Sequence, residues 1–219
     1  MQNNCICAKC ASGLWLPLVA VLALISCEHG HDHDHNHNHE NEVISRVVLT
    51  FTPTDGGAPL TFQFDDPDGD GGVSGTADRI DLTAGTEYTL ALRFENGLED
   101  PAEDLSGEIK EEAEEHFVFV LGDVAGPAST PAQALVTHAY ADRESDYGDN
   151  AVGDDLPVGL THTINATLAG EGTLRIMLRH LPPLNDQPQK TGDLPADLAA
   201  GRDLPGSVDV DVSFELVVS

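Results

Sequence analysis

The sequence predicts an all-β fold: an Ig-like or Greek-key β-sandwich with one short acidic helix, preceded by a signal peptide and a disordered His-rich tether. Three observations support this prediction. Apolar and polar residues alternate from Val43 onward, clusters of Gly, Pro and Asp separate the alternating runs, and a histidine stands at every second position from His29 to His39. Alternation is typical of half-buried strands. Many short strands between turn signals favour a sandwich.

The C-terminal run shows the alternation most clearly. From Ser207 to Ser219, one face carries Val208, Val210, Val212, Phe214, Leu216 and Val218, and the other carries Asp209, Asp211, Ser213 and Glu215. Similar runs lie at residues 60–64, 88–94, 160–168 and 174–180. Further β-rich runs occupy residues 44–53, 117–121 and 134–140. These runs predict about eight strands.

One segment has a helical pattern instead. Asp100 is placed to cap a helix that starts at Pro101, and Glu103 would complete a capping box. Apolar residues then recur at helical spacing on one stripe, at Ala102, Leu105, Ile109 and Ala113. We expect a helix over Pro101–Glu115 with an acidic exposed face.

The N-terminus has the features of a removable export signal. Lys9 is its charged residue, and the apolar run from Gly13 to Ile25 is of signal-peptide length. The following Leu24-Ile25-Ser26-Cys27 resembles the bacterial lipoprotein signal, in which the cysteine is acylated after cleavage. We therefore expect Cys27 to carry a lipid anchor in the bacterial cell envelope, at the outer membrane, with the face of that membrane left open.

Three parts follow from these boundaries. Residues 1–26 are the lipoprotein signal peptide, residues 27–42 are the lipidated cysteine with a His/Asp-rich flexible arm, and residues 43–219 are one β-sandwich domain. A stretch rich in Pro and Gly, Pro182–Gly206, predicts a long loop before the last strand.

The net charge limits the classes of partner. Asp and Glu number 38 against 10 Lys and Arg, for a formal net charge of −28. This excess argues against nucleic acid and anionic membrane surfaces as partners, since both are negatively charged. It suits cations, but adaptation to a salty habitat is an equal explanation.

The arm is the first candidate metal site. Its nitrogen ligands are His29, His31, His33, His35, His37 and His39, with Asp32 and Asp34 as oxygen ligands between them. His-rich tracts are typical of metal binding, and imidazole suits zinc, copper and nickel. We expect Zn²⁺, with Cu²⁺ or Ni²⁺ as other ions of the same preference. The alternative is a polar spacer between lipid and domain.

A second candidate is an acidic turn. Asp66, Asp68 and Asp70 form a D-x-D-x-D-G pattern like the first half of a calcium loop. The twelfth position is Ala77 and not glutamate, so a plain acidic turn is the alternative. Another acidic loop begins at Asp142 and is a weaker candidate for Ca²⁺.

Four histidines fall within the domain. His138, His162 and His180 lie on apolar faces of predicted strands, where a histidine is more often a core residue than a ligand. His116 follows two glutamates at the start of a predicted strand. If His116 and His180 lie at the same end of the sandwich, they form a second metal site.

Several short motifs resemble those of small β-rich lipoproteins of Bacteroidetes-type bacteria. The matching pieces are Asp66-Pro67-Asp68-Gly69-Asp70-Gly71, Pro101-Ala102-Glu103-Asp104, Pro157-Val158-Gly159-Leu160 and Leu178-Arg179-His180. This family has no settled function, so the resemblance implies the architecture and not an activity.

Enzyme motifs are missing from the sequence: it has no H-E-x-x-H, G-x-S-x-G or P-loop pattern. We therefore predict a non-enzymatic envelope lipoprotein that captures or buffers transition-metal ions, with an envelope metal transporter as a candidate partner. The alternative function is a surface adhesin or structural β-sandwich whose acidic loops bind calcium.

Overall fold

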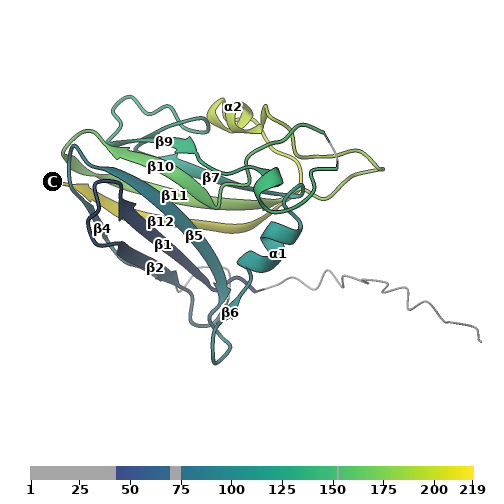
Figure 1. Cartoon of the computed structure of the whole chain (residues 1–219), viewed down its shortest axis with the longest axis horizontal. Coiled ribbons are helices and arrows are strands. Elements are labelled where there is room, and N and C mark those ends of the chain that lie inside the picture. The colour runs from purple at the N-terminus through teal and green to yellow at the C-terminus, as the bar shows by residue number, and fades with distance from the viewer. Residues whose placement is uncertain (1–42, 70–74, 152) are drawn as a thin grey trace, which may run out of the picture. The chain divides into compact units, whose positions relative to one another are not determined.

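Two β-sheets pack face to face around an apolar interior (Figure 1). The computed structural model describes residues 43–69, 75–151 and 153–219. An eight-stranded sheet has the order β3-β2-β1-β5-β10-β9-β8, with β6 paired to β5. A four-stranded sheet has the order β4-β12-β11-β7. This arrangement confirms the predicted all-β sandwich.

The chain passes repeatedly from one sheet to the other. The larger sheet contains β1 (Arg46–Pro53), β2 (Leu60–Asp65), β3 (Thr76–Ala77), β5 (Glu87–Asn96), β6 (Glu103–Asp104), β8 (Val124–Ala125), β9 (Val136–Tyr140) and β10 (Thr161–Ala166). The smaller contains β4 (Ile80–Leu82), β7 (His116–Gly122), β11 (Gly170–His180) and β12 (Ser207–Val218). Strands that are neighbours in space are therefore often distant in sequence.

The alternating pattern places apolar side chains between the sheets. Along β12, every second residue from Val210 to Val218 is buried, and the intervening Asp211, Ser213 and Glu215 are exposed. The strand β5 repeats this arrangement, with Leu90 and Phe94 fully buried. Burying an aliphatic or aromatic side chain contributes about 1.5–3 kcal/mol relative to leaving it exposed, so this interior is the main source of stability.

The strand β7 is buried on both faces. Its inward residues join the main core, while Phe117, Phe119 and Leu121 belong to a second apolar cluster on the outer face. That cluster is covered by the segment 182–206, which contributes Leu194 and packs Leu198 and Leu204 against it. The predicted loop therefore carries a short helix, α2 (Leu194–Ala199), and forms a cover for the smaller sheet.

The predicted helix over Pro101–Glu115 is wrong for most of its length. Helix α1 spans only Ser106–Glu111, and Asp100 does not cap it, because Glu103–Asp104 forms β6 and pairs with β5. This pairing, together with a 2.9 Å hydrogen bond from Leu105 N to Phe94 O, satisfies backbone groups that a longer helix would have used. Within the described residues, no helix is long and apolar enough to cross a membrane.

A buried carboxylate organises the loop between β9 and β10. Asp142 accepts hydrogen bonds from the backbone N–H groups of Gly159, Leu160 and Thr161 at 2.9, 2.7 and 3.1 Å, and from the Tyr147 hydroxyl at 2.9 Å. Such bonds are strong because the acceptor is charged. Asp142, the first acid of the second candidate calcium loop, therefore serves the fold by accepting these hydrogen bonds.

A buried ion pair connects this loop to the outer cover. Lys190 Nζ lies 2.6 Å from Glu144 Oε1 and donates a 2.7 Å hydrogen bond to Ala113 O, in the turn after α1. The ammonium also lies 5.2 Å from the centroid of the Phe117 ring. Burial lowers the pKa of Lys190, and Glu144 opposes that shift. Three segments that are remote in sequence thus meet at one ammonium group.

We expect Lys190→Met to lower the free energy of unfolding by about 3–5 kcal/mol, because it leaves the buried Glu144 carboxylate without its counter-charge. Chemical denaturation at pH 7 measures this change. Adding Glu144→Leu should recover part of the loss, since an apolar pair has no charge to desolvate. The control Lys110→Met, on the exposed side of α1, should change stability by less than about 0.5 kcal/mol. Equal losses for the two lysines would contradict the role given to Lys190.

Candidate metal centre

Two strand ends and a turn bring three ligand-type side chains together. His116, the first residue of β7, is the register partner of His180, the last residue of β11. Glu112 is the C-cap residue that follows α1, and it lies four residues before His116. One ligand atom from each of the three side chains can be chosen so that all lie within 4.8 Å of one another. The pairing of β7 with β11 therefore creates the cluster.

A second glutamate borders the same cluster. Glu112 Oε2 lies 3.9 Å from both His116 Nδ1 and His180 Nε2, and Glu115 Oε2 lies 3.5 Å from His180 Nε2. The two glutamate side chains are each 30% exposed, while that of His116 is 9% exposed. The carboxylates thus face solvent and the imidazoles lie behind them, which gives an incoming cation a path past the acids.

The relative orientation of the two imidazole rings determines how far the cluster must rearrange to bind an ion. His116 and His180 stack with ring centroids 4.7 Å apart and planes inclined by 6°. A ring nitrogen binds metal in the plane of its ring at about 2.0–2.1 Å, so parallel rings do not point at a common ion. Rotation of one ring is required, and the 3.9 Å glutamate–histidine distances must shorten for tetrahedral binding.

The neutral state of His116 at pH 7 favours metal binding. Burial, with the nearby His180 as the next cause, lowers the pKa of His116 to about 4, although its hydrogen bond with the backbone of Glu112 opposes the shift. His116 is thus neutral at pH 7 and has an electron pair to donate. His116 Nδ1 lies 3.2 Å from Glu112 O and 3.9 Å from Glu112 Oε2, so metal binding through this atom requires the tautomer with its proton on Nε2.

The structure brings together the two histidines that the sequence offered as a second metal site. Sequence reasoning missed Glu112, although its spacing of four residues from His116 places both side chains on one face of a helical turn. Glu115 was seen only as a neighbour of His116. The pairing of β7 with β11 is what adds His180.

The other candidate site residues lie either outside the described residues or away from this cluster. Cys27, the arm histidines His29 to His39 with Asp32 and Asp34, and Asp70 lie outside the described residues. Asp66 and Asp68 lie in the turn that follows β2. Asp66 is buried and accepts the Gly69 N–H at its carbonyl, while Asp68 is exposed.

The remaining histidines form a separate buried pair. His138 Nε2 and His162 Nδ1 are 2.7 Å apart, between β9 and β10, and both rings contact Tyr140. Burial lowers the pKa of His138 to about 3 and that of His162 to about 4. Both are therefore neutral core residues at pH 7, and neither belongs to the cluster of Glu112, His116 and His180.

Comparison with known proteins adds no assignment: no protein-family model, no curated protein and no solved structure matches the chain.

The buried histidines predict a loss of stability in acid. Their pKa values in the folded state lie below the ordinary value of 6.5, so the unfolded chain binds protons first as the pH falls. The free energy of unfolding should be fully retained above pH 6.5. It should decrease below that pH, by about 1.4 kcal/mol per pH unit for each histidine between its two pKa values.

Denaturation at pH 7.5, 6 and 5 measures this slope. The variant His138→Gln/His162→Gln should show a flatter dependence than the parent, because two of the groups no longer titrate. His116→Gln, which removes one such group, should flatten the slope less. Parallel pH curves for the parent and the double variant would show that these histidines do not control acid stability.

Proposed function

We propose that this protein binds transition-metal ions, with zinc first among them, and that the folded domain holds one ion between Glu112, His116 and His180. The observation that carries the proposal is the convergence of these three side chains at the paired ends of β7 and β11. Glu115 is close enough to His180 to supply a fourth ligand.

The ligand types favour zinc over calcium. Two imidazoles with one or two carboxylates are a nitrogen and oxygen set of the kind that zinc accepts in four-coordinate sites. Imidazole also suits copper and nickel, whereas calcium and magnesium prefer oxygen ligands alone. Copper binds most tightly in the general affinity order, so occupancy in the cell depends on which ion is supplied.

The His-rich arm extends this proposal to capture. Six histidines at alternate positions, from His29 to His39, would collect several ions with modest affinity, and Asp32 and Asp34 would assist. With a lipid on Cys27, the arm would lie next to an envelope membrane, where ions could pass to a transporter. The domain centre would hold a single ion more firmly, because the fold already brings its ligands close together.

Zinc titration of four apo full-length proteins tests the proposal. They are the parent, His116→Gln/His180→Gln, a variant with the six arm histidines replaced by serine, and His138→Gln/His162→Gln as a matched control. Calorimetry gives the number of ions bound, and thermal unfolding shows which ions are coupled to the fold. A ligand that binds only the native state raises the free energy of unfolding, by about 2.7 kcal/mol when its concentration is 100 times Kd. The melting temperature rises as a result.

We expect His116→Gln/His180→Gln to lose one ion and the zinc-dependent rise in melting temperature. The serine variant should lose the additional ions and keep that rise. The control should retain both. If His116→Gln/His180→Gln bound as much zinc as the parent with the same thermal shift, the domain centre would be ruled out. A rise in melting temperature with Ca²⁺ alone would favour the calcium-stabilised adhesin instead.

A further inference from the structure

The metal centre shares a turn with the cover of the smaller sheet (residues 182–206). This turn, residues 112–115, begins and ends with the two glutamates of the metal centre. Its backbone carbonyls bind the cover and the residue before it. Ala113 O accepts a 2.7 Å hydrogen bond from Lys190 Nζ, and the carbonyl of the last turn residue accepts a 2.6 Å bond from Leu181 N. The acidic side chains of the turn thus border the metal centre, while its carbonyls hold the cover.

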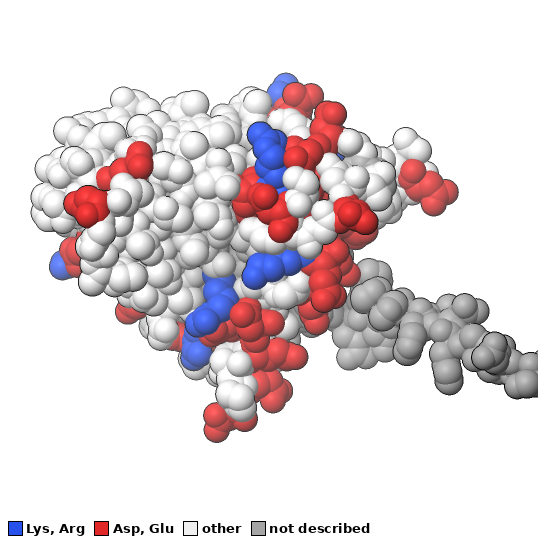
Figure 2. Space-filling model, in the orientation of Figure 1, with Lys and Arg blue, Asp and Glu red and all other residues white. Residues whose placement is uncertain are grey.

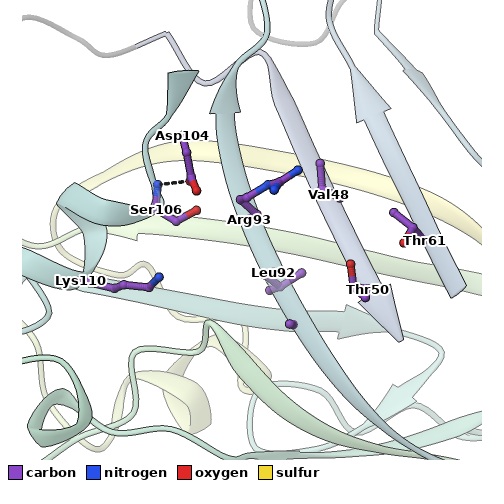
Figure 3. Close-up of a pocket in the computed structure, with 9 residues that line it drawn as sticks. Val48, Thr50, Thr61, Leu92, Arg93, Asp104, Ser106 and Lys110 are labelled. Atoms are coloured by element: carbon purple, nitrogen blue, oxygen red, sulfur yellow. Dashed lines mark hydrogen bonds between the residues drawn. The ribbon is translucent and has the colours of Figure 1, made fainter. Parts of the chain in front are cut away.

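The elements on either side of this turn are anchored without the cover. At the start of α1, Ser106 N donates a 3.0 Å hydrogen bond to Asp104 Oδ1, which Figure 3 shows beside the larger sheet. Ser106 Oγ also accepts a 2.9 Å bond from Phe94 N on β5. After the turn, His116 begins β7, which pairs with β11. Between these fixed ends, the bond from Lys190 holds the middle of the turn.

Acidic side chains surround this end of the domain. Figure 2 shows them gathered at the end of the sandwich where α1 lies, beside a broad area of the same face without charge. The helix and its turn carry five glutamates, Glu108, Glu111, Glu112, Glu114 and Glu115. Charges of one sign raise the local concentration of counter-ions and speed their association. Because this attraction does not depend on the cover, we expect the cover to affect the release of an ion more than its capture.

We propose that the cover is a latch for the metal centre: the docked cover slows release of the ion, and the bound ion holds the cover in place. This inference rests on the proposed function of the cluster of Glu112, His116 and His180. Opening of the cover frees the carbonyls of the turn, so its glutamates are no longer held close to the two histidines. The coupling is reciprocal, since an ion that binds the docked state more tightly must stabilise that state.

The charge of Lys190 distinguishes the latch from simple electrostatics. Its ammonium is close enough to be one cause, after burial and His180, of the lowered pKa of His116. Through charge alone this ammonium repels a metal cation, so its replacement by an uncharged residue would slow the release of the ion. The latch predicts the opposite sign, because the same replacement removes the bond to Ala113 O that holds the turn.

The rate of zinc release from the full-length protein tests the latch. Every sample has the six arm histidines replaced by serine, and a chromogenic chelator in excess reports how fast Zn²⁺ leaves the domain. We expect Lys190→Met to release zinc about tenfold faster than the parent, within the usual range of coupling between two sites. Lys190→Met/Glu144→Leu, which leaves no buried charge unpaired, should also release it faster. So should Leu194→Ala, which loosens the cover without changing any charge.

Two matched controls separate the latch from general effects on charge and stability. Lys110→Met removes an exposed ammonium of α1 that does not contact the cover. Leu216→Ala creates a cavity in the main core, far along β12 from Ser207, the residue that pairs with His180. Both controls should release zinc no faster than the parent.

Hydrogen exchange measures the reverse effect, that of the ion on the cover. Saturating zinc should slow exchange of the backbone amides of residues 182–206 at least about fivefold in the parent, and not in His116→Gln/His180→Gln. If the parent domain bound no zinc, the proposed function and the latch would both be wrong. If it bound zinc, but the cover variants released it no faster or the exchange of the cover stayed unchanged, the metal centre would stand and the latch would be wrong. Slower release from Lys190→Met would likewise overturn the latch and assign the effect of this residue to its charge.

Discussion

The buried pair of Lys190 and Glu144 is the contact on which the arrangement of the outer layer depends. It joins the cover of the smaller sheet, the loop between β9 and β10, and the turn after α1 at one point. Desolvating two charges is costly, so the pair is favourable only when both partners and the Ala113 carbonyl are in place. This requirement makes the three segments dock together, and it fixes the turn that carries Glu112 and Glu115.

The metal centre depends on a second constraint, which is the register of β7 against β11. Antiparallel pairing sets His116 opposite His180, and a shift by one residue would send every side chain to the other face. Such a shift would place Phe117 and Phe119 in the main core where the smaller Val118 and Val120 now lie, so the difference in side-chain size holds the register. Packing in the core thus determines which ligands meet at the surface.

The sequence was sufficient for the eight longer strands, but it did not predict the short strands β3, β4, β6 and β8 or the positions at which strands pair. Alternation in β12 and β5 identified buried faces directly, because the period of a strand is visible in a single chain. The helix was overextended because β6 pairing competes with helix formation, and local propensity does not report a distant partner. His116 and His180 could be suspected, but 64 residues separate them and only sheet register brings them together.

The double burial of β7 also bears on solubility. This strand is the last one in its sheet, and its residues from His116 to Leu121 are buried. An uncovered apolar end strand is a template for pairing with other chains, and proteins usually protect such edges with charges, bulges or a covering segment. Here the segment that carries α2 provides the cover over one face. A proteolytic cut within residues 182–206 would therefore leave the sandwich strands intact but loosen the cover over Phe117, Phe119 and Leu121, and exposed apolar side chains of this kind favour aggregation.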